Sequence, residues 1–272
     1  MSAAVTTFRW TGGRLEARDD CDVLPATIEA ADSWLVTGGR VRALDLHRSR
    51  FLAAIPEDVA ARLDVDGFWE AAIAALPREG DWFPRVELRT QSAAPQLLFR
   101  LRPAPELQRS IVLATHRGRD PRRAPRVKGP DLEAMVRLRT RVQAQGAGDA
   151  VILTPEGVVA EGATTSISWW RGDALALPAP GIPRIDSVTL RSVLALATAT
   201  GVDILYDEAR PEDLDGCEVW ALSALHGIRI VTRWIDGPSV AEQPGRLEDW
   251  RRRLDALRRP LPEPAPLPET GN

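Results

Sequence analysis

The chain has 272 residues, of which 44% are hydrophobic and 27% charged, and its formal net charge is -3 at pH 7. This length is sufficient to bury a sizeable core in one large domain or in two lobes. All but one of its 35 basic residues are arginines, yet the negative balance removes the electrostatic case for a nucleic-acid partner.

Other classes of protein are disfavoured by what the composition lacks. Two cysteines and three scattered histidines supply neither a disulfide framework nor a set of metal ligands. The first residues show no charged region followed by an apolar stretch, and no apolar run approaches the ~18 residues of a membrane span. We therefore expect a cytoplasmic protein that binds no metal and has neither a membrane nor a nucleic acid as partner.

Apolar spacing in the first third of the chain indicates a mixed α+β lobe. The expected strands are residues 6–10, a hairpin over 34–44, and residues 85–90, 96–102 and 110–115. Helices are expected at 45–55, where Asp45 is the predicted N-cap, and at 68–76.

A segment rich in proline, arginine and glycine follows and is expected to join two lobes. The predicted divisions are a small lobe over 1–117, a linker over 118–130, a larger cofactor-binding lobe over 131–259 and a proline-rich tail over 260–272. In the larger lobe the expected strands are 150–154, 158–162, 166–170, 174–178, 202–208, 217–222 and 227–236. The expected helices are 132–144, 187–200 and 246–257, the last with an apolar stripe that would face the core.

Lys128, at the end of the linker, is the single lysine of the chain. A solvated surface charge is the ordinary role of a lysine, but arginine fills that role everywhere else in this sequence. A guanidinium stays protonated and is a poor nucleophile, whereas an amine can lose its proton and condense with a carbonyl group. Lys128 is therefore a candidate Schiff-base lysine, and such lysines most often bind pyridoxal phosphate.

Pyridoxal phosphate requires a carboxylate at its pyridinium nitrogen and a binding site for its phosphate. Glu161 ends an apolar strand, where a buried carboxylate would need a cationic partner, although an ordinary strand-end glutamate is the alternative. Ser187, Val188 and Thr189 open a helix whose free N–H groups can bind an anion. The alternative is a helix start that Asp186 or Ser187 simply caps.

The order of these motifs resembles that of the class IV aminotransferases, the fold-type IV pyridoxal-phosphate enzymes. This family includes branched-chain and D-amino-acid transaminases and 4-amino-4-deoxychorismate lyase. Its H-x-x-R-[LF] helix is matched by residues 47–51, its G-x-V-x-E-G element by 157–162 and its [GS]-[IV]-T helix start by 187–189. The lyase-type element E-V-x-x-x-N-A-L resembles residues 218–225, and the resemblance as a whole covers roughly residues 40 to 240.

The resemblance implies a role for each matched residue. Lys128 would be catalytic, forming an aldimine with the cofactor and moving the proton at the substrate α-carbon. Glu161 would pair with the pyridine nitrogen. The remaining cofactor-binding residues, which would surround the phosphate, are Arg50, Ser187, Val188, Thr189, Ser223 and Ala224. Arg85 stands where some members of the family place a residue that contacts the substrate.

Three features depart from the family pattern. The family often has a tyrosine four or five residues after its lysine, where this chain has Leu132 and Glu133. A glycine-rich GDGxFE element before the first helix is absent, and Ser166 stands where many transaminases have asparagine. These departures leave the matched lysine, carboxylate and phosphate contacts in place, and they bear on the substrate and the reaction.

The sequence thus predicts an α/β (α+β) protein of two lobes with the fold-type IV architecture and the cofactor in a cleft between the lobes. By resemblance it would be a homodimer that transfers an amino group between a small amino acid and a 2-oxo acid through the Lys128 aldimine. One alternative is a β-elimination of the aminodeoxychorismate-lyase type, which the residues at 224–225 favour slightly. Another is a non-catalytic relative that retains the fold, which the missing tyrosine and glycine-rich element favour.

Overall fold

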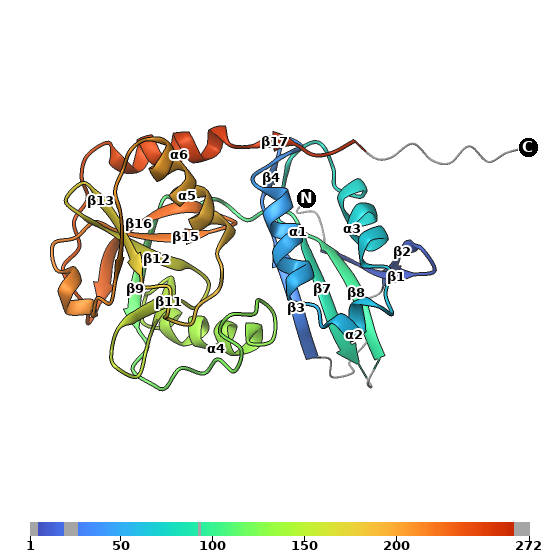
Figure 1. Cartoon of the computed structure of the whole chain (residues 1–272), viewed down its shortest axis with the longest axis horizontal. Helices are drawn as coiled ribbons and strands as arrows, with labels where there is room; N and C mark the ends of the chain where they lie inside the picture. The colour runs from blue at the N-terminus through green and yellow to red at the C-terminus, as the bar shows by residue number, and fades with distance from the viewer. Residues whose placement is uncertain (1–4, 19–26, 92–93, 264–272) are drawn as a thin grey trace, which may run out of the picture. The chain divides into compact units, whose positions relative to one another are not determined.

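A computed structural model describes residues 5–18, 27–91 and 94–263 of the chain. The described residues form two compact units: unit 1 runs to Pro105 and resumes at Arg258, and unit 2 is Glu106–Leu257 (Figure 1). Both units mix helices with sheets, which confirms the predicted α/β (α+β) class. No helix in the described ranges is long and apolar enough to cross a membrane. Among the same residues, no group of three or more His, Cys, Asp or Glu side chains is placed to hold a metal ion.

Unit 1 is built on a five-stranded antiparallel sheet with the strand order β2-β1-β8-β7-β3. Its strands are β1 (Thr6–Thr11), β2 (Arg14–Arg18), β3 (Thr27–Ser33), β7 (Arg85–Gln91) and β8 (Ala94–Leu101). A second sheet, in the order β17-β5-β4-β6, consists of β4 (Val36–Thr37), β5 (Arg40–Val41), β6 (Asp81–Trp82) and β17 (Arg259–Pro260). The helices are α1 (Leu44–Ala53), α2 (Glu57–Ala60) and α3 (Val65–Ala74).

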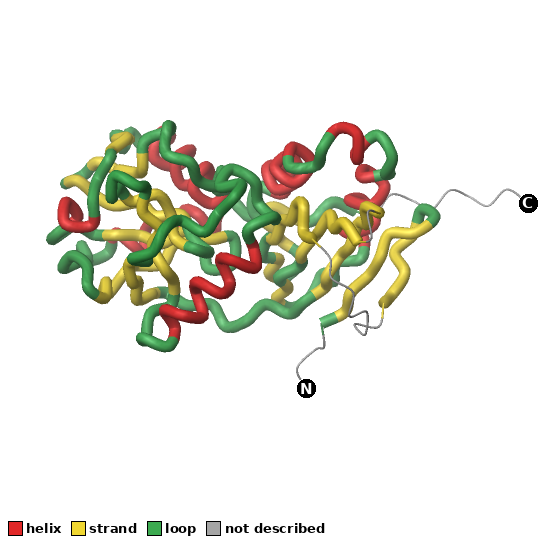
Figure 2. Tube along the Cα trace, turned by 90° about the horizontal axis from the view of Figure 1, so that it is seen from below, coloured by secondary structure: helices red, strands yellow, loops and turns green. Residues whose placement is uncertain are grey.

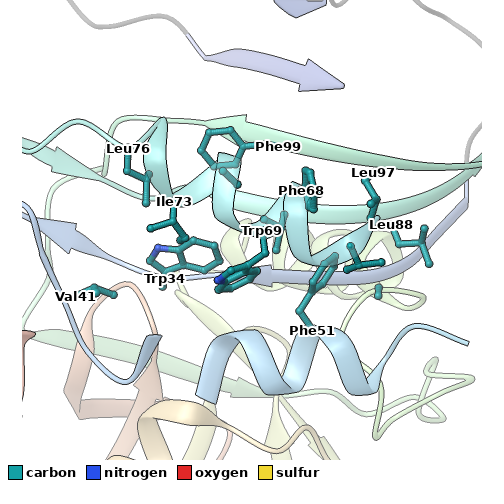
Figure 3. Close-up of a cluster of buried hydrophobic side chains, with 14 of the residues drawn as sticks. Trp34, Val41, Phe51, Phe68, Trp69, Ile73, Leu76, Leu88, Leu97 and Phe99 are labelled. Carbon is teal, nitrogen blue, oxygen red and sulfur yellow. The ribbon is translucent and has the colours of Figure 1, made fainter. Parts of the chain in front are cut away.

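Alternation along β7 and β8 decides which face of the larger sheet receives the helices. Val86 and Leu88 lie opposite Phe99 and Leu97 in the register, and all four side chains are buried. They belong to the same core as α1 and α3, which contribute Phe51, Phe68 and Trp69 (Figure 3). The intervening residues of β7 are charged and occupy the opposite face of the sheet.

The predicted N-cap of the first helix is wrong. Ala43 precedes α1 in the left-handed conformation, with a φ of 45°, and its carbonyl oxygen accepts hydrogen bonds from the N–H groups of Leu46 and His47. Asp45 lies inside the first turn instead. There its carboxylate complements the positive end of the helix dipole, so the same side chain stabilises the helix from a different position.

Unit 2 contains an eight-stranded mixed sheet in the order β11-β10-β9-β16-β15-β12-β13-β14. The strands are β9 (Ser110–Thr115), β10 (Asp149–Leu153), β11 (Val159–Gly162), β12 (Ser166–Arg171), β13 (Ala174–Pro178), β14 (Ile204–Asp207), β15 (Val219–Ser223) and β16 (Gly227–Ile235). The helices are α4 (Leu132–Gln143), α5 (Val188–Ala199), α6 (Arg246–Ala256) and the short 3-10 helix η1 (Pro211–Leu214).

Successive residues of these strands alternate between an inner and an outer core. On β15, Val219 and Ala221 face the inner core that the strands share, while Trp220 and Leu222 face α5 and α6. The outer face of β10 packs on α4, which lies across the strands from α5 and α6 (Figure 1). Helices and loops thereby surround the strands of unit 2 (Figure 2). Strand ends and the loops between them are then the places where polar groups can gather.

We expect Trp220→Ala to destabilise unit 2 strongly. Trp220 is fully buried and makes edge-on contacts with Trp170 and Trp250, with ring centroids 5.2 and 5.6 Å away. Removing so large a buried side chain should lower the free energy of unfolding by about 3–5 kcal/mol, as measured by urea unfolding. Tyr206→Ala is the control, because that side chain is 57% exposed and its loss should change stability by about 0.5 kcal/mol or less. Equal effects of the two substitutions would contradict this packing.

Candidate functional site

Glu161 is a buried carboxylate at the end of a buried strand. β11 pairs antiparallel with β10, where Ile152 lies opposite Glu161, and the chain then turns through residues 162–165 into β12. The residue is only 5% exposed. A carboxylate in such surroundings requires hydrogen-bond donors or cations, because neither oxygen can rely on water.

Two groups from other segments satisfy the Glu161 carboxylate. The guanidinium of Arg122 forms an ion pair with Oε1, and the backbone N–H of Ile185 lies 3.3 Å from each oxygen. Arg122 also binds both oxygens of Asp120 and donates to the carbonyl oxygen of Pro183 at 3.3 Å. Glu161 therefore joins the segment before α4 to the segment before α5.

Burial raises the pKa of Glu161 to about 7, and the positive charges around it act in the opposite direction. Arg122 lowers this pKa most, followed by the N–H of Ile185, the ammonium of Lys128 and the guanidinium of Arg184. Because the pKa of this carboxyl group lies near 7, one further cation beside it would stabilise its ionised form. This is the property that a pyridinium nitrogen requires of its partner, so the buried carboxylate fits the predicted cofactor.

Lys128 is half-buried on a loop that is closed by hydrogen bonds at its base. Asp131 accepts hydrogen bonds from the backbone N–H groups of Arg123 and Ala124, at 2.9 and 2.8 Å. Within the loop, Gly129 has a φ of 147°, which side chains with a Cβ rarely tolerate. Because Lys128 acts electrostatically on Glu161, this loop brings the only lysine into the neighbourhood of the buried carboxylate.

The start of α5 presents backbone donors close to Glu161. Ser187 is the N-cap, and its hydroxyl accepts a hydrogen bond from the N–H of Leu190 at 3.2 Å. The N–H groups of Val188 and Thr189 donate to no residue that the structure describes, and both residues are buried. Buried helix donors of this kind can bind an anion such as a phosphate. They follow Ile185, which itself binds Glu161, so one short segment holds both a donor to Glu161 and the predicted phosphate contacts.

Ser223 and Ala224 lie at the end of β15, beside the turn that follows Glu161. Ser166, the first residue after that turn, pairs with Leu222 in the β12–β15 register. The hydroxyl of Ser223 accepts a hydrogen bond from the N–H of His226 at 3.2 Å. Unit 2 therefore brings together Lys128, Glu161, the start of α5 and, through the sheet register, the turn at 223–224.

A second buried acid fixes the turn between β11 and β12. Asp149 is fully buried, and its Oδ2 accepts hydrogen bonds from the N–H and hydroxyl of Thr164 and from the hydroxyl of Thr165, at 3.0, 3.0 and 2.8 Å. Burial raises the pKa of Asp149, while these donors lower it. Hydrogen bonds to the Asp149 side chain of β10 thus fix the conformation of the turn that follows Glu161.

The other two candidate residues, Arg50 and Arg85, belong to unit 1. Arg50 binds both oxygens of the fully buried Asp32, at 2.7 and 2.8 Å, and His47 Nδ1 lies 2.8 Å from the same carboxylate. Burial alone would raise the pKa of Asp32, but His47 and Arg50 hold it well below its usual range. Arg85 forms an ion pair with Glu87 at 3.2 Å.

Sequence reasoning did not find Arg122, Asp131 or Asp149. The expectation that a buried Glu161 needs a cation was a signal for Arg122, but the linker offers several arginines at similar spacing. Asp131 carried the signal of a helix N-cap, yet its side chain bonds backwards to the loop rather than to α4. Nothing in the local pattern distinguishes Asp149 from an ordinary polar residue at the start of a strand.

Comparison with known proteins gives a consistent result. The model of the family described as amino-transferase class IV matches residues 29–234. A hypothetical aminotransferase from Mycobacterium tuberculosis in its PLP-bound form is 19% identical with a TM-score of 0.74, covering 93% of this chain and 98% of its own. The branched-chain aminotransferase of Thermoproteus uzoniensis with norvaline is 17% identical with a TM-score of 0.76, covering 94% and 100%.

The branched-chain aminotransferase from Escherichia coli is 14% identical with a TM-score of 0.75, covering 91% of this chain and 92% of its own. At these identities the likeness establishes the fold, which confirms the predicted fold-type IV architecture. A comparison with curated protein sequences gave no match.

We expect the stability of the cofactor-free protein to depend on the protonation of Glu161. The pKa of this carboxyl is about 7 in the folded chain, against the ordinary value of 4.5 for a glutamate side chain. The folded chain therefore holds more protons than the unfolded chain between these values. The resulting stabilisation is complete below about pH 4.5 and is lost as the pH rises through 7, and it amounts to about 3 kcal/mol.

Urea unfolding at a series of pH values checks this expectation. Glu161→Gln should remove the decline between pH 4.5 and 7, whereas Glu133→Gln should keep it, because that side chain is 83% exposed. If the wild-type and Glu161→Gln profiles run parallel through this range, Glu161 does not titrate as described.

Proposed function

The chain belongs to the class IV aminotransferase family, and we propose that it transfers an amino group between a small amino acid and a 2-oxo acid with Lys128 as its covalent attachment point for the cofactor. Membership makes the protein an enzyme that depends on pyridoxal 5'-phosphate and acts on amino acids and oxo acids. The observation that carries the proposal is the buried carboxylate of Glu161, whose pKa the ammonium of Lys128 lowers, together with the N–H groups at the start of α5 that lack partners among the described residues.

All the proposed cofactor contacts except Arg50 belong to unit 2. When bound, pyridoxal phosphate supplies an aldehyde that condenses with amines and a ring that accepts the electrons of a bond broken at the α-carbon. We assign Glu161 to the ring nitrogen. The residues assigned to the phosphate are Ser187, Val188, Thr189, Ser223 and Ala224. Support for these assignments comes from the buried carboxylate and from the helix donors that lack partners among the described residues.

Lys128 has the chemistry that its neighbours lack. Its amine can lose a proton and act as a nucleophile or a base, whereas the guanidinium groups of Arg122 and Arg184 stay protonated. We therefore assign to Lys128 both the attachment of the cofactor and the movement of the proton at the substrate α-carbon. The loop closed by Asp131 supports this assignment, because it restricts where the amine can reach.

The two arginines of unit 1 keep the roles that the family pattern implies. We propose that Arg50 contacts the cofactor phosphate, and Asp32 supports this by holding the guanidinium in one orientation from both oxygens. Arg85 is proposed to contact the substrate. We further propose that the enzyme acts in the cytoplasm and that it is a homodimer. Light scattering of the purified protein would test the oligomeric state.

Replacing Lys128 tests its attachment to the cofactor. Protein saturated with pyridoxal phosphate should show an absorbance band in the visible range, and Lys128→Ala should lose that band because no amine remains to condense. Lys128→Arg retains a positive charge and should lose it as well, which separates the amine chemistry from the charge. Wild-type protein that takes up no cofactor at saturating concentration, or a band that persists in Lys128→Ala, would contradict the proposal.

The reaction itself is tested with a panel of amino donors and the acceptors pyruvate and 2-oxoglutarate. We expect transfer to at least one oxo acid. The second candidate is a β-elimination of the aminodeoxychorismate-lyase type, which the Ala224–Leu225 turn favours because it matches the lyase element. Release of pyruvate from 4-amino-4-deoxychorismate, without transfer to any oxo acid, would establish the lyase instead. Cofactor binding without either reaction would indicate a non-catalytic relative.

A further inference from the structure

Arg122 is a buried cation that the expected roles of the site residues leave unused. Its side chain is 4% exposed, and its guanidinium reaches three acceptors from three parts of unit 2. These are the carboxylate of Glu161, the carboxylate of Asp120 and the carbonyl oxygen of Pro183. A guanidinium with this many acceptors is held in one place, so its charge is a permanent feature of the Glu161 environment.

The segment that carries Arg122 is held by contacts on the C-terminal side of this residue. Asp131 binds the N–H groups of Arg123 and Ala124, directly after Arg122. Further along the same loop, Arg126 donates to the carbonyl oxygen of Gly181 at 3.1 Å. The loop is therefore joined to the segment before α5 at two points, through Arg122 and through Arg126. Arg122 cannot leave Glu161 without breaking contacts that also shape the loop carrying Lys128.

The Glu161 carboxylate retains room for another donor. An ionised carboxylate has about four lone-pair sites. Arg122 binds Oε1, and the N–H of Ile185 is shared between both oxygens. The positive charge of Arg184 lowers the pKa of the same carboxyl, but its guanidinium donates hydrogen bonds to the carbonyl oxygens of Ala179 and Ile182. The Glu161 carboxylate therefore binds one cation directly, that of Arg122, and keeps at least one lone pair that can accept a hydrogen bond from a further N–H group.

We propose that Arg122 is a permanent counter-cation of Glu161 that shares this carboxylate with the ring nitrogen of the cofactor, and that it thereby weakens the preference of the site for a protonated ring. The inference rests on the proposed function, which assigns the ring nitrogen to Glu161. Arg122 acts through Glu161 and is a positioning residue, not a catalytic one.

The physical reason is the competition of two positive groups for one negative charge. A lone buried carboxylate would favour a protonated ring strongly, because the ring would supply its only neutralising partner. A carboxylate already neutralised by Arg122 gains less from a second cation, and the guanidinium repels a positive ring at short range. Arg122 should also favour the ionised form of Glu161, since the positive charges of Arg122, Lys128 and Arg184 all lower the pKa of this carboxyl.

Two ligands that differ only at the ring nitrogen test the proposal. We would measure the dissociation constants of pyridoxal phosphate and of its 1-deaza analogue, in which a C–H group replaces that nitrogen, through quenching of tryptophan fluorescence. The preference for pyridoxal phosphate over the analogue should rise about tenfold in Arg122→Gln, equivalent to about one pKa unit. Arg122→Lys keeps the charge and should remain near the wild-type preference.

Matched variants separate this role from a structural one. Arg126→Gln alters the same loop without touching Glu161 and should leave the preference unchanged, whereas Glu161→Gln should abolish it whether or not Arg122 is present. If Arg122 only supported the fold, Arg122→Gln would weaken both ligands by the same factor, and an unchanged preference would overturn the proposal. Arg122→Met, which fills a similar volume without charge, replaces Arg122→Gln if the latter does not fold.

A titration of the cofactor-free protein distinguishes failure of this inference from failure of the proposed function. The carboxyl carbon of Glu161 can be followed by NMR in protein labelled with ¹³C-glutamate and assigned with Glu161→Gln. Its apparent pKa should rise by more than one unit in Arg122→Gln and should not change in Arg126→Gln. An unshifted pKa would overturn the counter-cation role, whereas wild-type protein that binds no pyridoxal phosphate would overturn the proposed function alone.

Discussion

The candidate site depends on the burial of one carboxylate, that of Glu161. An ionised group removed from water must find donors within the protein, and here they come from two segments far apart in the chain. Arg122 approaches from the segment before α4 and Ile185 from the segment before α5. The requirement to neutralise Glu161 is therefore also the constraint that brings the loop of Lys128 and the start of α5 to the end of β11.

Two further buried acids extend the same principle to the neighbouring loops. Asp131 binds two backbone N–H groups and closes the loop of Lys128, and Asp149 binds three donors in the turn after Glu161. Backbone groups in loops lack the regular partners of helices and sheets, so a buried carboxylate that accepts from them can define a loop conformation. The loops around the candidate site are in this way ordered by side chains rather than by secondary structure.

The order of helices and strands was largely predictable, because apolar periodicity is a local property. The three helices expected in the larger lobe correspond to α4, α5 and α6, and the alternation of β7 and β8 was evident from their residues. The N-cap of α1 was not predictable in the same way. Asp45 has the preferred side chain, but the left-handed backbone at Ala43 starts the helix two residues earlier.

By itself the sequence determined that a single lysine lies among arginines, that a glutamate ends a buried strand and that a serine-led helix follows at family spacing. These features follow from residue identity and local pattern, and they indicated a cofactor and an enzyme family. Only the tertiary structure decided that Arg122, of all the arginines in the linker, binds Glu161, and that Asp32 holds Arg50. Such pairings depend on which side chains are buried together after the chain has folded. The spacing of two residues along the sequence does not give the distance between their side chains in the fold.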